Sequence, residues 1–425
     1  MLHFYKKIRK SLEKIGPGFI TGAADDDPSG IATYSIAGAQ YGYRLNWLSV
    51  FLLPAMISIQ EMCGRIGMCT GMGLAKVIKT HESKRLLVLA VSLLAVANII
   101  NIGADLGIIA ASIQMLLGFP FWYWILVTAI FITWMEIAVS YKNYSKYLKY
   151  LGLILLVYVV TAFIVKQNWR EVVFYTLIPH IDLNFGYIMT MVGFLGTTIS
   201  PYLFFWQANE EVEEEIESKE IADFDYKPKV RSREIQNMGW DTKVGMFFSN
   251  FVTFFIILTT TATLFSNGIH DIETPQQAAL ALKPLAGNFA YLLFALGIIG
   301  IGLQSIPVLA GSLAYAVAET FDWKEGLSKK FGQAQQFYIV LALATLIGML
   351  MNMLGINTMK ALYYAAVVNG ITAVPLIFMI IKMADNKEIV GNHTSKPSHR
   401  AVGWIIFWFM LISVVVMIYG MVSGN

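Results

Sequence analysis

The sequence predicts an all-α, polytopic membrane protein, built as an inverted repeat of five plus five helices with an eleventh helix after them. Of its 425 residues, 56% are hydrophobic and only 14% are charged, whereas about 25% are charged in ordinary soluble domains. With a mean hydropathy of +0.60, a water-soluble fold cannot hide the apolar side chains. Helix breakers interrupt the first and the sixth apolar stretch, which is the spacing that such a repeat predicts.

Apolar stretches of roughly 20 residues, enough to cross about 30 Å of hydrocarbon, recur eleven times. They cover residues 15–41, 46–68, 86–117, 121–140, 147–166, 187–207, 242–266, 287–317, 336–354, 359–382 and 401–422. We expect one transmembrane domain over 1–425, in which 1–166 forms the first repeat, 187–382 the second and 401–422 the last helix.

The basic residues predict the orientation, since an odd number of spans places the termini on opposite sides. With a cytoplasmic N-terminus, 26 of the 31 Lys and Arg residues fall on the cytoplasmic side. The five others are Arg44, Lys166, Arg170, Lys283 and Lys360. The positive-inside rule therefore predicts a plasma (inner) membrane protein with its N-terminus in the cytoplasm and its C-terminus outside. The basic start MLHFYKKIRKSLEKIG continues directly into the first span, so we expect no cleaved signal peptide.

Two other features exclude functions. The net charge of +3 is dispersed, and no basic tract alternates with aromatic residues, so we expect no nucleic-acid partner. Cys63 and Cys69 lie six residues apart without a CxxC pair. This pattern predicts buried thiols rather than a disulfide or a metal site.

Two polar segments separate spans. The longest, 209–241, is rich in Glu, and we interpret it as a solvated connector, with an acidic cytoplasmic regulatory site as the alternative. The segment 267–286 contains TPQQAALALKPLAG, which predicts a short surface helix beginning after Thr274-Pro275.

The first broken span is GPGFITGAADDDPSGIATYSIAGAQYG. Proline lacks a backbone donor and glycine tolerates an unwound conformation, so we expect the helix to open at Asp27-Pro28-Ser29-Gly30. A carboxylate at this depth costs roughly 2.5 to 3.5 kcal/mol, which makes it a candidate functional group. We expect Asp27 to bind an ion, whereas Asp25 and Asp26 line an ion pathway, or else a water-filled vestibule, or cap the second half-helix.

The second broken span, MTMVGFLGTTISPYLFFWQANEE, is interrupted at Gly196-Thr197-Thr198 and at Ser200-Pro201. In an inverted repeat the two breaks face each other at the membrane midplane and hold the substrate. The groups brought together are a carboxylate, backbone carbonyls and hydroxyls. This all-oxygen set favours a hard cation over a soft one.

Four further polar residues lie within apolar spans. Asp105 and Glu136 are candidate ion or proton waypoints, or else carboxyls paired with a neighbouring helix. Gln304 and Asn369 reach the central site or, as the simpler alternative, form hydrogen bonds between helices.

The string GPGFITGAADDDPSGIATYSIAGAQYGY resembles the first helix of the NRAMP family of divalent metal transporters, in which GP-F and DPGN-AT stand at the same spacing. TTISPY is similar to that family's TVMPHN in helix six, Gln304-Ser305 falls at its GQS in helix eight, and Asp105 matches an acidic residue in helix three. The resemblance extends over nearly the whole chain. It implies the LeuT-like fold, with import of divalent cations by alternating access.

The resemblance also implies a ligand set. Asp27 matches the coordinating aspartate, and Ala24 and Thr197 match positions whose carbonyls face the ion. Gly30 stands where the family has a coordinating asparagine, and Ser200 where it has a methionine that favours transition metals.

Two further departures concern proton coupling. Tyr202 replaces a histidine, and the segment QAQQFYIVLALATLIGML lacks the basic residues of the family's helix nine. The pattern is similar to the NRAMP-related magnesium transporters, in which the methionine is lost and a wider site admits a more hydrated ion.

We therefore hypothesise import of Mg²⁺, and also of Mn²⁺, by a monomer with no enzymatic activity and no cofactor, whose partners are the ion and membrane lipid. Mg²⁺ dehydrates reluctantly and is held by one or two carboxylates plus retained waters. The alternatives are a proton-coupled importer of Mn²⁺ or Fe²⁺, a cation-coupled symporter of a small solute, and a sensor that acts through residues 210–225.

Overall fold

The computed structural model describes residues 17–139 and 153–423, and every regular element in this part of the chain is helical. The longer helices are α2 (Pro17–Asp25), α3 (Pro28–Tyr41), α5 (Leu53–Thr70), α7 (Lys84–Leu117), α8 (Phe121–Ala138), α10 (Leu156–Ile164), α12 (Phe185–Thr198), α13 (Pro201–Glu217), α14 (Ser232–Thr263), α17 (Ala290–Phe321), α18 (Gln335–Met351), α19 (Thr358–Asp385) and α21 (Pro397–Ser423). Shorter helices connect them, namely α4 (Trp47–Phe51), α6 (Leu74–His81), α11 (Trp169–Leu177), α15 (Pro275–Ala279), α16 (Lys283–Ala286) and α20 (Lys387–Val390).

The predicted fold class is confirmed. Within the described residues, nine helical stretches are long and apolar enough to cross a membrane, and Leu153–Ile164 forms a shorter apolar helix. Together with the broken pair α2 and α3, they account for the eleven predicted spans. The basic N-terminal residues and the loop 142–149, which entered the orientation argument, lie outside the described residues.

The loops divide into two groups, as the predicted topology requires. On one side Lys76 Nζ lies 2.9 Å from Asp225 and 2.8 Å from Asp322, which joins three predicted cytoplasmic segments. On the other side, the side-chain amide of Asn357 donates to the carbonyl of Glu273 at 2.9 Å, joining two predicted outer segments. α2 begins beside α14 on the first side, and α21 ends beside the start of α12 on the second.

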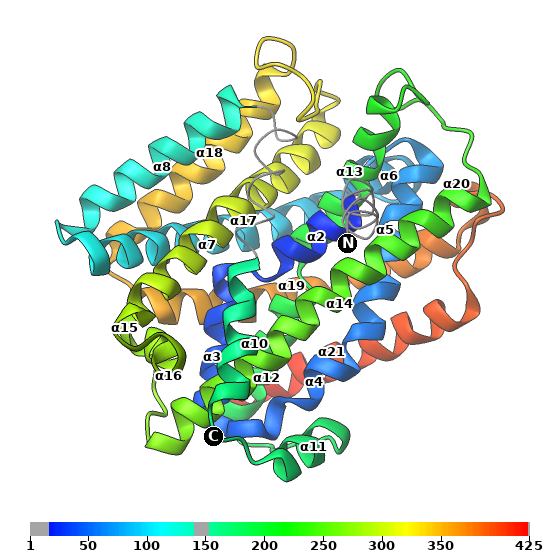
Figure 1. Cartoon of the computed structure of the whole chain (residues 1–425). Coiled ribbons are helices and arrows are strands. Elements are labelled where there is room, and N and C mark those ends of the chain that lie inside the picture. The colour runs from blue at the N-terminus through cyan, green and yellow to red at the C-terminus, as the bar shows by residue number, and fades with distance from the viewer. Residues whose placement is uncertain (1–16, 140–152, 424–425) are drawn as a thin grey trace, which may run out of the picture.

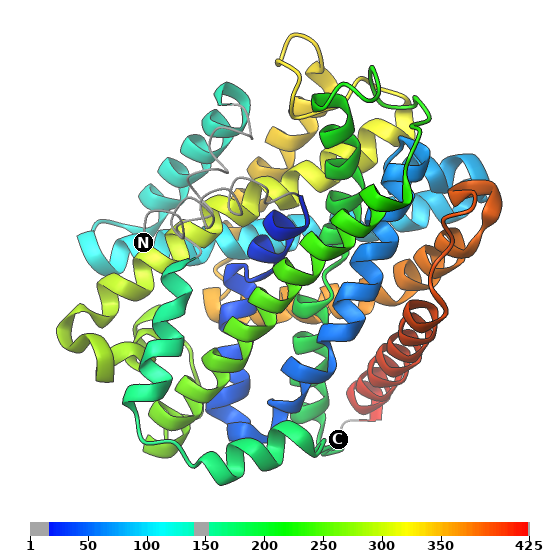
Figure 2. The ribbon, with the colours of Figure 1, turned by 45° about the vertical axis from the view of Figure 1, so that its right-hand side comes forward.

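The two broken helices occupy the middle of the bundle (Figure 1). In the most apolar 18-residue window of Phe185–Glu217, 94% of residues are buried inside the protein, against 33% in the corresponding windows of α8 and α18. α8 and α18 lie together at one edge in Figure 1, and α21 lies at the periphery in Figure 2. The peripheral helices therefore face lipid, and the broken ones are surrounded by protein, where open backbone groups are tolerated.

Both breaks fall directly before a proline. Asp26 and Asp27 separate α2 from α3, and Ile199 and Ser200 separate α12 from α13. Pro28 and Pro201 are the first residues of the second half-helices. There the missing N–H is harmless, and the residue before a proline is pushed out of the helical conformation.

The expected limits of the breaks were partly wrong, because Ser29, Gly30 and Gly196-Thr197-Thr198 are helical. Glycine serves close packing here rather than unwinding. A Cβ on Gly196 would lie 2.1 Å from the carbonyl oxygen of Ala366 and 2.2 Å from the nitrogen of Gly370, both on α19.

The interpretation of 209–241 as a solvated connector was also wrong for much of its length. Residues up to Glu217 continue α13, and residues from Ser232 begin α14. Glu211, Glu213 and Glu215 are 5%, 6% and 5% exposed. The charge run does not distinguish the two faces of the helix, and only the packing of α13 against α5 and α17 decides which face is buried.

The expected surface helix in 267–286 is confirmed. α15 begins at Pro275, and Thr274 caps it by accepting a hydrogen bond from the N–H of Gln277 while the Gln277 side chain accepts from the N–H of Thr274. This reciprocal capping box compensates the free donors of the first turn.

The ion pairs of Asp322 lead to a prediction about pH. Hydrogen bonds from Lys76 and Lys79 lower the pKa of Asp322 to about 2, against about 3.9 in an unfolded chain. A lowered pKa stabilises the fold above the unfolded value, and this contribution is lost as pH falls from about 4 through about 2. We expect Asp322→Asn to lower the melting temperature of the detergent-solubilised protein at pH 7, by the equivalent of up to about 1 kcal/mol for an exposed pair, and this effect to shrink as pH falls from about 4 to about 2. Glu388→Gln, which removes an exposed carboxylate, is the control, and a difference at pH 2 as large as that at pH 7 would contradict the assignment.

Candidate ion-binding site between the broken helices

Asp27 is the N-cap of α3, and its carboxylate is buried between the broken helices with 1% exposure. Oδ1 accepts hydrogen bonds from the hydroxyl of Ser29 and the N–H of Gly30, both at 2.7 Å. Oδ2 accepts from the side-chain amide of Asn101 at 2.7 Å. These three donors orient the carboxylate and compensate part of the cost of its burial.

Asn101 was missed in the sequence analysis. It lies on α7, between Asn98 and Asp105. The amide of Asn98 donates to the carbonyl of Leu309 on α17, and Asp105 accepts from Ser305 on α17 at 3.2 Å. The spacing of three and four residues, which places all three polar side chains on one helix face, was the signal in the sequence that could have revealed Asn101.

The two breaks meet around Gly30. A Cβ on Gly30 would lie 3.1 Å from Oγ1 of Thr197 and 3.5 Å from Oδ1 of Asp27. The Thr197 hydroxyl is fully buried and has no hydrogen-bond partner among the described residues. A few residues away, the hydroxyls of Tyr34 and Thr198 lie 3.0 Å apart. A side chain at position 30 would therefore point into the space between Asp27 and Thr197.

Ser200 directly precedes Pro201, and its hydroxyl forms hydrogen bonds within the second break. That hydroxyl donates to the carbonyls of Thr197 and Gly196, at 2.8 and 3.0 Å. The oxygen of Ser200 keeps its lone pairs, but the carbonyl of Thr197, which the family resemblance places at the ion, already accepts a hydrogen bond. At Thr197 the group without a partner is the hydroxyl.

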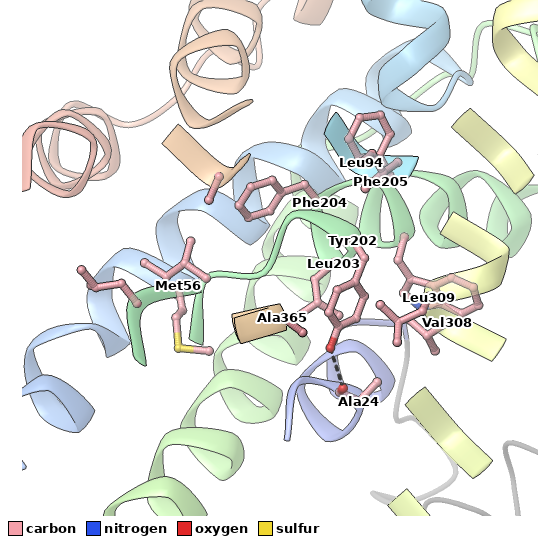
Figure 3. Packing of buried hydrophobic residues seen from close by; sticks show 14 of the residues in the cluster. Ala24, Met56, Leu94, Tyr202, Leu203, Phe204, Phe205, Val308, Leu309 and Ala365 are labelled. Carbon is pink, nitrogen blue, oxygen red and sulfur yellow. Dashed lines mark hydrogen bonds between the residues drawn. The ribbon is translucent and has the colours of Figure 1, made fainter. Parts of the chain in front are cut away.

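Ala24 and Tyr202 connect the two half-helices on the predicted cytoplasmic side. The hydroxyl of Tyr202, on α13, donates to the carbonyl of Ala24, on α2, at 3.0 Å (Figure 3). Both residues are fully buried. The carbonyl that the resemblance assigns to the ion thus accepts a hydrogen bond from Tyr202, and this contact joins the two half-helices.

Asp25 and Asp26 point to a different helix from Asp27. Oδ2 of Asp25 and Oδ1 of Asp26 accept from the hydroxyl of Ser249 on α14, at 2.6 and 3.1 Å, and Thr253 donates to Asp26 at 3.4 Å. One oxygen of each carboxylate has no partner in the described part of the chain. They therefore link α2 to α14 beside the first break.

The remaining candidates, Asp105, Gln304, Asn369 and Glu136, are all buried. Asp105 lies close enough to Asp27 for their charges to interact. The Gln304 carbonyl oxygen, both amide atoms of Asn369 and both oxygens of Glu136 have no hydrogen-bond partner among the described residues. For Glu136, on the peripheral helix α8, no contact with the other candidates is seen.

The identified groups around Asp27 are hydroxyls, amides and backbone groups. Among the described residues, no three His, Cys, Asp or Glu side chains converge as they would around a bare metal ion. With one carboxylate at its centre, the site suits a hard cation that keeps part of its water shell.

Three comparisons bear on this geometry. The family model described as Natural resistance-associated macrophage protein-like, Nramp, matches residues 18–420. The divalent metal cation transporter MntH of Caldanaerobacter subterraneus is 23% identical over 99% of this chain and 96% of that protein. The MntH of Klebsiella pneumoniae is 24% identical over 94% and 92%.

Among solved structures, the manganese transporter of Eremococcus coleocola superposes with a TM-score of 0.76 at 17% identity, covering 99% of this chain and 89% of that one. The nucleobase-cation symporter Mhp1 superposes with a TM-score of 0.61 at 10% identity, over 96% and 92% of the two chains. At these identities, the two structures support the fold alone.

Asn101 leads to a prediction. Asn101→Ala should weaken Mn²⁺ binding to the purified protein by roughly tenfold, since partners that orient a metal ligand contribute 10- to 100-fold in affinity. Asn98→Ala is the matched control, because it lies one turn away on the same helix but donates to α17 instead of Asp27. Titration calorimetry measures both, and equal affinities for Asn101→Ala and Asn98→Ala would contradict the assigned role.

Proposed function

Because the chain belongs to the Nramp family of membrane transporters, we propose that it carries hard divalent cations, Mg²⁺ and also Mn²⁺, into the cytoplasm by alternating access. Asp27 is the principal ligand. The protein resides in the plasma membrane with its N-terminus in the cytoplasm, as its basic residues predict.

The observation that carries the proposal is the oxygen-only set of groups around Gly30. Where the NRAMP pattern has a carboxamide, this chain has no side chain, and the Thr197 hydroxyl packs so closely that a Cβ here would lie 3.1 Å from its oxygen. Ser200 supplies an oxygen where the pattern has a sulfur. Removal of the thioether lowers the preference for soft ions, and without the carboxamide the ion keeps water in place of that ligand.

Retained water fits the energetics of Mg²⁺. This ion is small and dehydrates reluctantly, so proteins bind it through one or two carboxylates and several waters. The buried polar atoms that lack partners near the first break, on Thr197, Asp25 and Asp26, are acceptors to which such waters can donate. Mn²⁺ is accepted by the same oxygen ligands.

Alternating access requires contacts that form on one side of the ion and open on the other. The hydrogen bond from Tyr202 to Ala24 is such a contact on the predicted cytoplasmic side. It joins two half-helices that end at the site, so a shift of either one breaks it. Release of the ion inward therefore requires the separation of α2 from α13.

We propose no proton coupling by the family's usual route, because the residues that carry it in the NRAMP pattern are replaced here. Tyr202 stands at the histidine position, and its hydroxyl is used in holding Ala24. α18 contains no Lys, Arg or His. We propose that the ion moves down its own electrochemical gradient.

The second candidate is a proton-coupled importer of Mn²⁺ or Fe²⁺. The names of the sequence relatives support it, since they are divalent metal cation transporters of the MntH type. On this view Ser200 and water replace the sulfur ligand. The likeness to Mhp1 concerns the fold, and a small-solute symporter has no support at Asp27, which repels a substrate carboxylate.

A flux assay in liposomes tests the proposal. With Mg²⁺, Mn²⁺ and Cd²⁺ compared with and without a pH gradient, we expect uptake of Mg²⁺ and Mn²⁺, little Cd²⁺ uptake and no acceleration by protons. Asp27→Ala should abolish uptake, whereas Asp25→Ala, which disturbs the contact with Ser249, should retain part of it. Ready Cd²⁺ uptake without Mg²⁺ or Mn²⁺ uptake would refute the proposed substrate, and equal losses in the two variants would refute Asp27 as the first ligand.

The selectivity argument is also tested by restoring the residues of the NRAMP pattern at positions 30 and 200. The double variant Gly30→Asn and Ser200→Met adds a carboxamide beside Asp27 and a thioether at the second break. We expect Cd²⁺ to bind at least tenfold more tightly and Mg²⁺ flux to fall, because soft ligands favour soft ions. Gly193→Ala, on α12 outside the break, is the control, since its Cβ meets nothing closer than 3.4 Å. Unchanged Cd²⁺ binding, measured by calorimetry, would count against the selectivity argument.

A further inference from the structure

An acidic cavity lies at the predicted cytoplasmic ends of α13 and α14, apart from the site at Asp27. Its volume is about 220 Å³. Six carboxylates line it, Glu211, Glu214, Glu215, Glu220, Glu234 and Asp241, and none of the lining residues is basic. These residues belong to the segment that the sequence suggested was a solvated connector.

Glu215 distinguishes this cavity from a solvated acidic surface. Its side chain lines the cavity but is only 5% exposed. Oε2 of Glu215 is buried and has no hydrogen-bond partner among the described residues. An ionised carboxylate buried without a donor or a counter-ion is costly, so this group either takes up a proton or binds a positive partner.

Two nearby basic side chains are engaged elsewhere. Lys243 on α14 lies 3.2 Å from Glu61, and Arg65 on α5 lies 3.7 Å from the same carboxylate. Glu61 does not line the cavity. The negative charge of the cavity is therefore not cancelled by these two residues.

The buried face of α13 leads from the second break to the cavity. Gln207, Glu211 and Glu215 follow one another at intervals of four residues and so share one helix face. The amide of Gln207 donates to Oε1 of Glu211 at 2.7 Å. A buried hydrogen bond therefore positions Glu211, the carboxylate that precedes Glu215 on this face.

The cavity has room for an ion that keeps its water. Among the described residues, no three His, Cys, Asp or Glu side chains converge as they would around a bare metal ion. A cavity volume of this kind holds one water in roughly 10–15 Å³, so an ion with six waters fits. Carboxylates then bind the water shell, in the way Mg²⁺ is commonly held.

We propose that this cavity is a second binding site, for a hydrated hard divalent cation, in which Glu215 and Glu234 hold the ion between α13 and α14. The binding site is inferred from the cavity alone, whereas its effect on transport rests on the proposed function. A cation bound there links the half-helix that carries Tyr202 to α14, so under the proposed cycle the concentration of the ion in the cytoplasm acts on a helix that moves when the site at Asp27 opens.

Calorimetric titration of Mg²⁺ into the full-length protein in lipid nanodiscs tests the site. Asp27→Ala removes the central ligand and should leave one binding event. In that background, Glu215→Gln with Glu234→Gln should weaken the remaining event at least tenfold, because the substitutions keep the shape and remove two charges. Glu234→Gln alone, at a half-buried position, keeps the test valid if the buried substitution impairs folding, and should weaken binding several-fold.

The matched control is Glu82→Gln with Glu388→Gln, which removes two charges at exposed positions outside the cavity. It should leave the affinity within about twofold. Equal weakening by the control pair would mean that general surface charge attracts Mg²⁺ and that the cavity does not bind it. Unchanged binding in the Glu215 and Glu234 variants would also overturn the proposed site. A protein that binds Mg²⁺ here and transports none would refute the proposed function while leaving this site intact.

Discussion

The structure depends on the burial of one carboxylate, Asp27, at the depth of the membrane interior. A charged group there costs several kcal/mol unless it is compensated. The broken helix supplies part of the compensation, since ending α2 and restarting at Pro28 directs the N–H of Gly30 and the hydroxyl of Ser29 at the carboxylate. The same break requires protein on all sides, and this explains why the broken helices lie in the middle of the bundle and the continuous apolar helices at its edge.

The helices around the site are arranged by the polar groups that this carboxylate requires. The face of α7 that carries Asn101 contacts Asp27 and, one turn to either side, hydrogen-bonds to α17. Asp25 and Asp26 bind α2 to α14 through Ser249. Tyr202 binds it to α13. α2 is thus held by these hydrogen bonds and by close packing on α14, where a Cβ on Gly22 would lie 2.2 Å from the carbonyl carbon of Gly245.

The acidic cavity lies on α13 and α14, the two helices that contact α2, so an ion bound there as proposed would act on these contacts. In both proposed sites, sparse carboxylates would bind an ion through its water. They differ in their surroundings. Asp27 is surrounded by donors that orient it, whereas Glu215 has an oxygen that no group in the described residues satisfies. The first arrangement favours selectivity, and the second favours attraction of any hydrated dication.

The sequence by itself determined the number of spans, the positions of both breaks to within a few residues, and Asp27 as the central group. Each of these depends on local chemistry, namely apolar length, the missing donor of proline and the cost of an intramembrane charge. The tertiary structure alone decided which residues meet. Asn101 lies 74 positions from Asp27 along the chain and donates to it. Tyr202 donates to the carbonyl of Ala24. Gly30 and Gly196 lie within helices, and their lack of a side chain permits close helix packing instead of unwinding. Likewise, the Glu-rich segment reads as solvated because charge runs usually are, and only the packing of α13 places Glu215 in the interior. Contacts between distant segments depend on how whole helices pack, and no local pattern records that.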